Sequence, residues 1–337
     1  MDPQTSSRPF VVIIALLIDV ALGDPPNRLH PVAWMGSAIA AARRQAPRPG
    51  TDWDVGRGKL LPLAYGGLIG LGGSLGVYGL GLLTQGLIDR LPTPFHWLTE
   101  AALLKTTFSV RGLARAADEI QSALDRGDLP EARRLTSWHL VSRDTSALTR
   151  SQVAAATIQS VAESTSDGIM APIVSYLCAG LPGALAYRFA NTADSMLGYR
   201  DAAREWLGKI PARWDDLLNL LPSRLTALFL TVGALLTDGD ASRAWRVWRR
   251  DRRKTASPNA GHPMSAMAGA LGVELEKIDH YALGGGGQHP EAADISRAVR
   301  VMTASVALGA ALLVSLHFLQ GTSRCPSPDG QTNTSSP

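Results

Sequence analysis

The amino-acid sequence predicts an all-α, polytopic membrane protein. Charged residues make up only 18% of the 337 residues, which is below the roughly 25% of an average soluble protein. Residues 60–88 and 301–319 contain no charged residue, and residues 220–236 contain one, Arg224. Since about 20 apolar residues are enough for a helix to cross a bilayer, these three segments are expected to be membrane spans.

Two further hydrophobic segments are shorter or interrupted. Residues 10–22 are apolar except for Asp19, and a lone carboxylate in such a segment is expected to face a partner. Residues 168–187 are interrupted by proline and glycine, and a broken helix at membrane depth is tolerated only where it lines a cavity or contacts protein. We therefore expect three to five hydrophobic segments, of which at least one is re-entrant or interfacial.

The remaining segments suggest how the chain is organised. We expect one integral membrane domain over residues 1–320, with large polar loops at 89–167 and 238–300 that contain soluble helices. Residues 206–216 are interpreted as a linker. Residues 321–337 are rich in proline and serine and are expected to be a disordered tail.

Short-range spacing makes two further predictions. Glycines four residues apart, at Gly66/Gly70 and Gly72/Gly76, predict close packing between helices. Asp128, which precedes a Leu-Pro-Glu sequence, is expected to cap the N-terminus of a helix.

The net charge is +4, and part of the basic excess lies in one run from Arg243 to Lys254, which also contains Trp245 and Trp248. Basic and aromatic residues together are typical of nucleic-acid binding and of contact with an anionic lipid surface. Because the run follows a predicted membrane segment, we favour membrane lipids as the partner and expect no nucleic acid. The two cysteines have no metal-binding spacing.

Two polar clusters flank residues 168–187. The first extends from Glu163 to Asp167, and the second from Arg188 to Arg200. Carboxylates, amides and hydroxyls at this density are costly to bury without partners, so they indicate either a ligand site or a solvated loop. The sequence pattern by itself leaves both interpretations open.

Five motifs in order along residues 10–285 resemble the CobD/CbiB family. They are Asp24–Val32 (DPPNRLHPV), Glu163–Gly168 (ESTSDG), Asn191–Arg200 (NTADSMLGYR), Asp216–Thr226 (DLLNLLPSRLT) and Ser257–Pro263 (SPNAGHP). Met264 departs from the resemblance, since a polar residue is expected there. The family is that of adenosylcobinamide-phosphate synthase, also called cobinamide synthase.

The resemblance implies an enzyme of cobalamin biosynthesis, a multi-pass ligase of the cell membrane. It would join aminopropanol, or aminopropanol O-phosphate, to the free propionate carboxylate of (adenosyl)cobyric acid, with ATP as co-substrate and Mg²⁺ as cofactor. Other expected partners are membrane lipids, a second copy of the chain, and other membrane enzymes of the pathway.

Forming an amide from a carboxylate requires carboxylates for Mg²⁺, cations for phosphate and a base for the amine. The candidate catalytic residues are Glu163, Asp167, Asp194 and His30, and the three carboxylates among them are also the candidate metal ligands. The candidate substrate-binding residues are Asn191, Arg188, Arg200, Asn219, Asn259 and Lys105. Since neither a P-loop nor a kinase glycine loop is present, nucleotide binding depends on the resemblance alone.

Two other functions are compatible with the predicted fold. One is a non-catalytic signalling protein similar to the AmpE type, which would not require the full set of Glu163, Asp167, Asn191 and Asp194. The other is a small-molecule transporter, suggested by the broken segment 168–187 and by Asp19. Transporters usually contain internal repeats, and the sequence has none.

Overall fold

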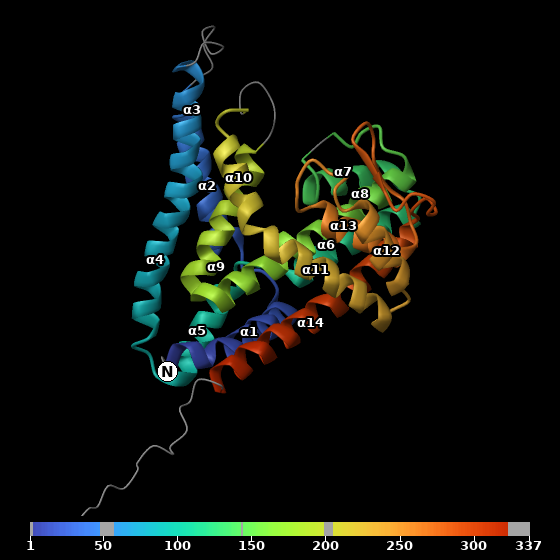
Figure 1. The fold of residues 1–337 in the computed structure, drawn as a ribbon. Coiled ribbons are helices and arrows are strands. Elements are labelled where there is room, and N and C mark those ends of the chain that lie inside the picture. Colours follow the sequence, from blue (N-terminus) through green and yellow to red (C-terminus); the bar gives the residue numbers. More distant parts are fainter. Residues whose placement is uncertain (1–2, 48–56, 143, 199–204, 323–337) are drawn as a thin grey trace, which may run out of the picture.

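The computed structural model describes residues 3–47, 57–142, 144–198 and 205–322, and these residues are largely helical (Figure 1). The helices are α1 (Pro3–Leu22), α2 (Pro31–Arg44), α3 (Arg57–Gly67), α4 (Gly73–Ile88), α5 (Thr93–Lys105), α6 (Val110–Asp125), α7 (Leu129–His139), α8 (Arg150–Ser164), α9 (Ala171–Leu197), α10 (Lys209–Leu218), α11 (Leu220–Gly233), α12 (Ala241–Asp251), α13 (Gly261–Leu271) and α14 (Ala292–Thr322). Two short strands, β1 (Leu275–Lys277) and β2 (Tyr281–Leu283), pair antiparallel. Most of the predicted tail, from residue 323 onward, lies outside the described residues.

Three helical segments of the described chain are long and apolar enough to cross a membrane. They are Lys59–Ile88, Arg150–Leu197 and Ala292–His317. The predicted span 60–88 falls in the first of these segments, and residues 301–317 of the predicted span 301–319 fall in the third. Residues 220–236 form the longer arm of a pair of helices bent by 50°, which adds a fourth span if the pair is counted as one. The prediction of an all-α polytopic membrane protein is confirmed.

The segment that contains residues 168–187 is one long helical path with two irregularities. α8 passes into α9 through a π-helix at Thr165–Met170, and α9 is interrupted at Gly180, where φ is 69° and ψ is −166°. A positive φ of this size is accessible to glycine without steric cost. The predicted interruption is therefore real, and it redirects the second half of α9 toward α10 and α4.

Glycines in α3, in α4 and in the π-helical turn Leu68–Gly72 between them were predicted to pack closely, and only the first pair does so. A Cβ atom at Gly66 would lie 1.8 Å from the Leu207 carbonyl oxygen, and one at Gly70 would lie 3.0 Å from the Pro211 ring. At Gly76, no described atom would lie within 4 Å. The pair Gly66/Gly70 therefore faces protein, whereas Gly76 does not.

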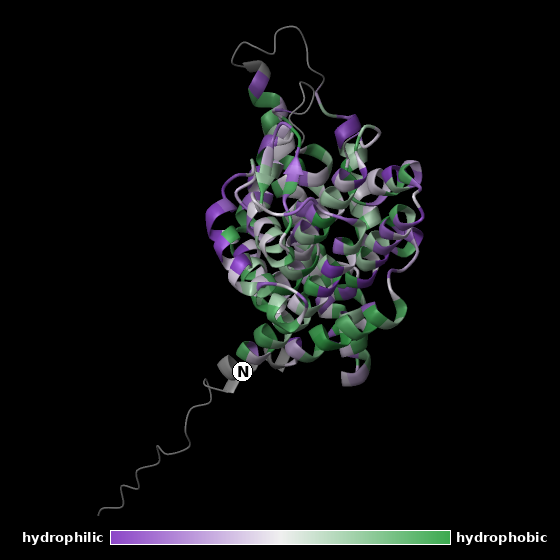
Figure 2. Cartoon of the chain, turned by 90° about the vertical axis from the view of Figure 1, so that its right-hand side faces the viewer, coloured by the Kyte–Doolittle hydropathy of each residue, from purple (hydrophilic) through white to green (hydrophobic). Residues whose placement is uncertain are grey.

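Helices α6, α7, α8, α12 and α13 form a compact group beside the long helices (Figure 1). Every residue of α13 is buried, and a Cβ atom at Gly269 would lie 2.6 Å from the Ala244 Cα atom of α12. The Asp128 side chain accepts a hydrogen bond from the Glu131 backbone nitrogen at 3.0 Å, so the predicted cap of α7 is confirmed. Figure 2 shows hydrophobic residues gathered toward the lower edge of the molecule and hydrophilic residues over the upper part.

The interpretation of residues 206–216 as a linker is wrong. This stretch contains the start of α10, which packs against α9 and α3. The ten-residue helix is amphipathic rather than apolar, and a segment this short is difficult to separate from a polar loop by periodicity. α10 supplies one wall of the cavity that Glu163 and Asp167 line.

Candidate functional site

The first polar cluster lies at the junction of α8 and α9. A capping box formed by Thr149 and Gln152 begins α8, and the helix continues to Glu163. The π-helix that follows contains Asp167. Because residues four apart lie on one face of a helix, Glu163 and Asp167 point to the same side, and single-turn π-helices are frequent at functional sites.

Both carboxylates line a cavity of about 440 Å³ between the α8–α9 junction, α10 and the start of α13. Its lining residues are Glu163, Ser166, Asp167, Asp194, Gly198, Glu205, Gly208, Lys209, Ala212, Arg213, Asp215, Asp216, Asn219, Ala256, Ser257, Asn259, Ala260 and Pro263. We call this space the main cavity. Its volume lies within the range of about 300–1,000 Å³ that is usual for small-molecule sites.

A second cavity of about 370 Å³ shares one wall with the main cavity. The shared residues are Glu163, Asp167, Asp194 and Gly198, and Asn191 lines only the second cavity. The three carboxylates that the sequence singles out therefore stand where two spaces meet.

A hydrogen-bond network of amide and phenol side chains holds Asp167 and the neighbouring Asp215 in place. The Asn191 Nδ2 atom donates toward Asp167 Oδ2 at 3.5 Å and Asp215 Oδ1 at 3.3 Å. Asn219 Nδ2 donates to Asp215 Oδ2 at 3.0 Å, and the Tyr187 hydroxyl lies 2.8 Å from Asn219 Oδ1. Since buried hydrogen-bond networks fix side-chain orientation, Asp167 and Asp215 are held at defined positions.

Arg188 contacts this network through Asn191, and it is not among the described residues that line the two cavities. Its Nη1 atom donates to Asn191 Oδ1 at 3.1 Å. Its buried Nε atom has no hydrogen-bond partner among the described residues. Arg188 therefore positions Asn191 in this structure.

The motif residue Asn259 joins the far wall of the main cavity to α10 and α11. Its Nδ2 atom donates to the Asp216 carbonyl oxygen at 2.7 Å. Its Oδ1 atom accepts a hydrogen bond from Arg224 Nη1 at 3.2 Å. These contacts bring the motifs around Asp216 and Asn259 together in space, although they are distant in the sequence.

His262, in the same motif as Asn259, has a structural contact. Its Nδ1 atom accepts a hydrogen bond from Trp248 Nε1 at 3.0 Å in the protein interior. Burial, together with the positive charges of Arg224, Arg252 and Arg253, lowers the pKa of His262 to about 4. The imidazole is therefore neutral at physiological pH and serves as a hydrogen-bond acceptor.

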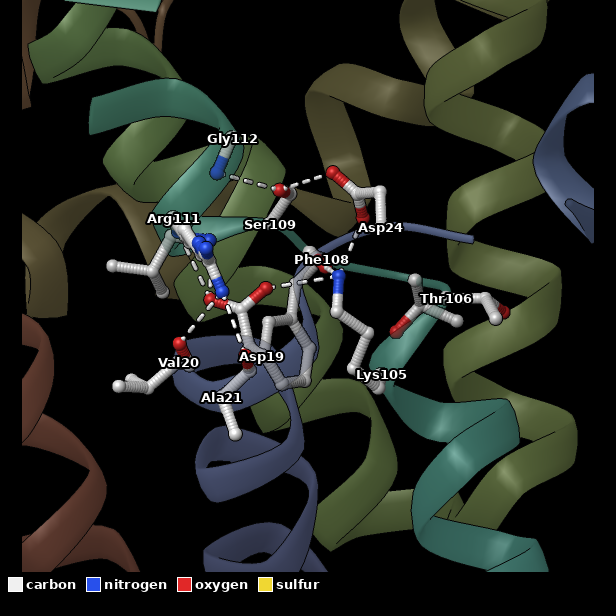
Figure 3. A network of polar contacts seen from close by, with 12 residues as sticks. Asp19, Val20, Ala21, Asp24, Lys105, Thr106, Phe108, Ser109, Arg111 and Gly112 are labelled. Atoms are coloured by element: carbon white, nitrogen blue, oxygen red, sulfur yellow. Dashed lines mark hydrogen bonds and ion pairs between the residues drawn. The ribbon is translucent and has the colours of Figure 1, made fainter. Parts of the chain in front are cut away.

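Lys105 lies in a different network, shown in Figure 3. Its Nζ atom is 2.9 Å from Asp19 Oδ1, and it also contacts Asp24 and the Phe108 carbonyl oxygen. Lys105 is 2% exposed and Asp19 is fully buried. Asp19 was expected to face a partner, and that partner is Lys105. The charge of Lys105 is therefore neutralised within the protein.

His30 lies at the edge of the same network. Its Nε2 atom is 3.9 Å from Asp24 Oδ1, and its Nδ1 atom accepts a hydrogen bond from the Val32 backbone nitrogen at the start of α2. Burial opposes the charged form of Asp24, but the contacts with His30, Lys105 and Ser109 outweigh it and hold the pKa of Asp24 well below its usual range. As far as the structure describes the chain, neither His30 nor Lys105 lines the two cavities.

The site thus gathers most, but not all, of the candidate residues. Glu163, Asp167, Asp194, Asn219 and Asn259 line the main cavity, and Asn191 lines the second one. Arg200 lies outside the described residues. Among the described residues, no group of three or more His, Cys, Asp or Glu side chains is placed to hold a metal ion.

Several lining residues with polar or charged side chains were not among the candidates, and they include Ser166, Lys209, Arg213, Asp215 and Asp216. The four on α10 were missed because that helix was interpreted as a linker. The available signal was the spacing of Asp215 and Asn219, which places both side chains on one helical face.

Comparisons with known proteins identify the family of this chain. The family model described as CobD/Cbib protein matches residues 12–302. The chain is 42% identical over 274 residues to the cobalamin biosynthesis protein CobD of Dehalococcoides mccartyi, covering 81% of this chain and 86% of that protein. It is 36% identical over 313 residues to the cobalamin biosynthesis protein CbiB of Salmonella typhimurium, covering 90% and 95% respectively. No solved structure matches the chain. This chain therefore belongs to the CobD/CbiB family of cobalamin biosynthesis proteins.

Proposed function

We propose that the protein catalyses ATP-dependent amide bond formation in cobalamin biosynthesis, at the cell membrane. The reaction joins aminopropanol, or its O-phosphate, to the free propionate carboxylate of (adenosyl)cobyric acid. The observation that carries the proposal is the convergence of four separate motifs, represented by Glu163, Asp194, Asn219 and Asn259, on one cavity. A signalling protein would not require this convergence of carboxylates and amides.

The chemistry explains why such a cavity is useful. A carboxylate is a poor acyl donor because its leaving group would be oxide. Attack of the propionate oxygen on the γ-phosphorus of ATP gives an acyl phosphate and releases ADP. The amine nitrogen then attacks the acyl carbon, phosphate leaves, and the proton lost by the amine passes to a base. In our proposal Glu163 or Asp194, which stand where the two cavities meet, takes this proton.

The wall of carboxylates that the two cavities share suits Mg²⁺ bound together with a nucleotide on the side of the second cavity. Mg²⁺ commonly takes one or two protein carboxylates and completes its shell with phosphate oxygens and water. Glu163, Asp167 and Asp194 are the candidate ligands, so the absence of a described three-residue metal group does not conflict with this mode. The ion would neutralise charge on the transferred phosphoryl group.

The proposal is tested with Glu163→Gln and Asp194→Asn, which remove a carboxylate and keep the side-chain size. The matched control is Glu131→Gln, because Glu131 is paired with Arg134 on the surface helix α7. Removing a proton-transferring or metal-binding group is expected to lower turnover at least about 100-fold, with membrane insertion intact. Turnover of both site variants equal to that of the control would contradict the assignment.

A further inference from the structure

The main cavity is electrically asymmetric. Asp167 and Asp215 lie on its inner side, where Asn191 contacts both carboxylates. Lys209 and Arg213 line the same cavity from α10, and their side chains are 44% and 69% exposed. The two cations therefore lie toward solvent, beside the Glu205 and Asp216 carboxylates that pair with them, and Asp167 and Asp215 lie on the side where Asn191 bridges them.

The two cations share one face of α10. Lys209 and Arg213 are four residues apart, which places their side chains next to each other along the helix. α10 begins at Lys209, and its N-terminus has no side-chain cap among the described residues. The partial positive charge of a helix N-terminus adds to that of the two side chains.

The existing partners of these cations are readily exchanged. Lys209 is 3.8 Å from Glu205, and Arg213 is 3.4 Å from Asp216. Ion pairs between exposed side chains are weak because water and salt screen them. A phosphate group offers Arg213 a bidentate, charge-assisted contact that can replace its pair with Asp216.

Ser166 supplies an independent sign of a ligand on the acidic side. Ser166 is 4% exposed and lines the main cavity. Its Oγ atom has no hydrogen-bond partner among the described residues. The neighbouring Thr165, which is also buried, donates its hydroxyl to the Val161 carbonyl oxygen at 2.6 Å. Because buried hydroxyls are normally paired, the Ser166 hydroxyl is the group that a bound molecule would satisfy.

We propose that the main cavity is the subsite of the amine substrate, with its nitrogen beside Ser166 and the inner carboxylates and its anionic end on Lys209 and Arg213. This inference rests on the proposed function, and it assigns Lys209 and Arg213 as the residues that distinguish a phosphorylated amine from an unphosphorylated one. The corrinoid, which is several times larger than the amine, then approaches from outside the main cavity.

The test measures KM for aminopropanol phosphate, aminopropanol and ATP with Lys209→Met, Arg213→Met and Ser166→Ala. Each cation variant is expected to raise KM for aminopropanol phosphate about tenfold or more, and to leave the other two KM values unchanged. Ser166→Ala is expected to raise KM for both amines and not for ATP. The matched controls are Thr165→Val for the buried hydroxyl and Arg115→Met for an exposed cation.

A rise in KM for ATP in place of the amine, or no change in any KM, would overturn the proposal. Calorimetric titration of the purified protein with aminopropanol phosphate gives a readout that does not need turnover. If wild-type protein binds aminopropanol phosphate in the way these variants predict but makes no product, the proposed function fails and the subsite stands. If product forms and the variants leave every KM unchanged, the subsite fails and the proposed function stands.

Discussion

Lys105→Met removes the cation that faces Asp19 inside the protein. The Lys105 Nζ atom lies 2.9 Å from Asp19 Oδ1, with the lysine side chain 2% exposed and the aspartate fully buried. The other Asp19 oxygen accepts hydrogen bonds from the Val110 and Arg111 backbone nitrogens at 3.1 Å and 2.9 Å. Removing one partner of a buried ion pair leaves an uncompensated charge, which costs about 3–5 kcal/mol.

The loss of folding stability is measured as a change in the thermal unfolding midpoint, Tm, of the purified protein in detergent. We expect Lys105→Met to lower Tm by roughly 5–15 °C, using the usual few degrees per kcal/mol for a chain of this size. Arg115→Met is the control, because Arg115 is 79% exposed in its pair with Glu119 and such pairs contribute less than about 1 kcal/mol.

The double variant Asp19→Asn/Lys105→Met identifies the cause. Asparagine still accepts the hydrogen bonds from Val110 and Arg111 but carries no charge, so most of the lost stability should return. If Lys105→Met is as stable as Arg115→Met, or if the double variant is no more stable than the single one, the assignment of Lys105 as the charge partner of Asp19 is wrong.

Two further predictions concern packing and pH. Gly66→Ala should lower Tm in detergent, because the added Cβ atom would lie 1.8 Å from the Leu207 carbonyl oxygen. Gly76→Ala meets no described atom within 4 Å and should leave Tm unchanged or higher. Equal Tm values for the two variants would contradict the packing of Gly66 against Leu207. For His262, the folded-state pKa of about 4 lies below the ordinary 6.5. The stability that it contributes is complete above pH 6.5 and is lost, up to about 3 kcal/mol, as pH falls toward 4. His262→Gln, which keeps an acceptor for Trp248, should therefore show a smaller fall in Tm between pH 7 and pH 4.5 than the wild type. The same fall in Tm in both proteins would refute the assignment of His262 as the titrating group.

The sequence was sufficient for predictions that depend on local pattern. Residues 60–88 and 301–319 are apolar over enough length to identify them as spans. Asp19 was expected to have a partner because an isolated charge in an apolar segment is costly. The polar cluster from Glu163 to Asp167 was left open between a ligand site and a solvated loop, and in the structure both carboxylates line the main cavity.

Predictions that depend on tertiary packing were not accessible in this way. Nothing in the sequence around Asp19 indicates that its partner is Lys105, which the packing of α1 on α5 brings close. His30 and Lys105 were grouped with the site by residue type, but the fold places them in a separate network. α10 was missed because its ten residues are too few for a clear helical period.

The reaction itself tests the proposed function most directly. Purified protein in detergent is incubated with adenosylcobyric acid, ATP, Mg²⁺ and either aminopropanol phosphate or aminopropanol, and the corrinoid is followed by mass spectrometry. We expect a product heavier than adenosylcobyric acid by the mass of the amine less one water, formed only when ATP is present and lost in Glu163→Gln. Folded wild-type protein that gives no such product with either amine would contradict the proposed function.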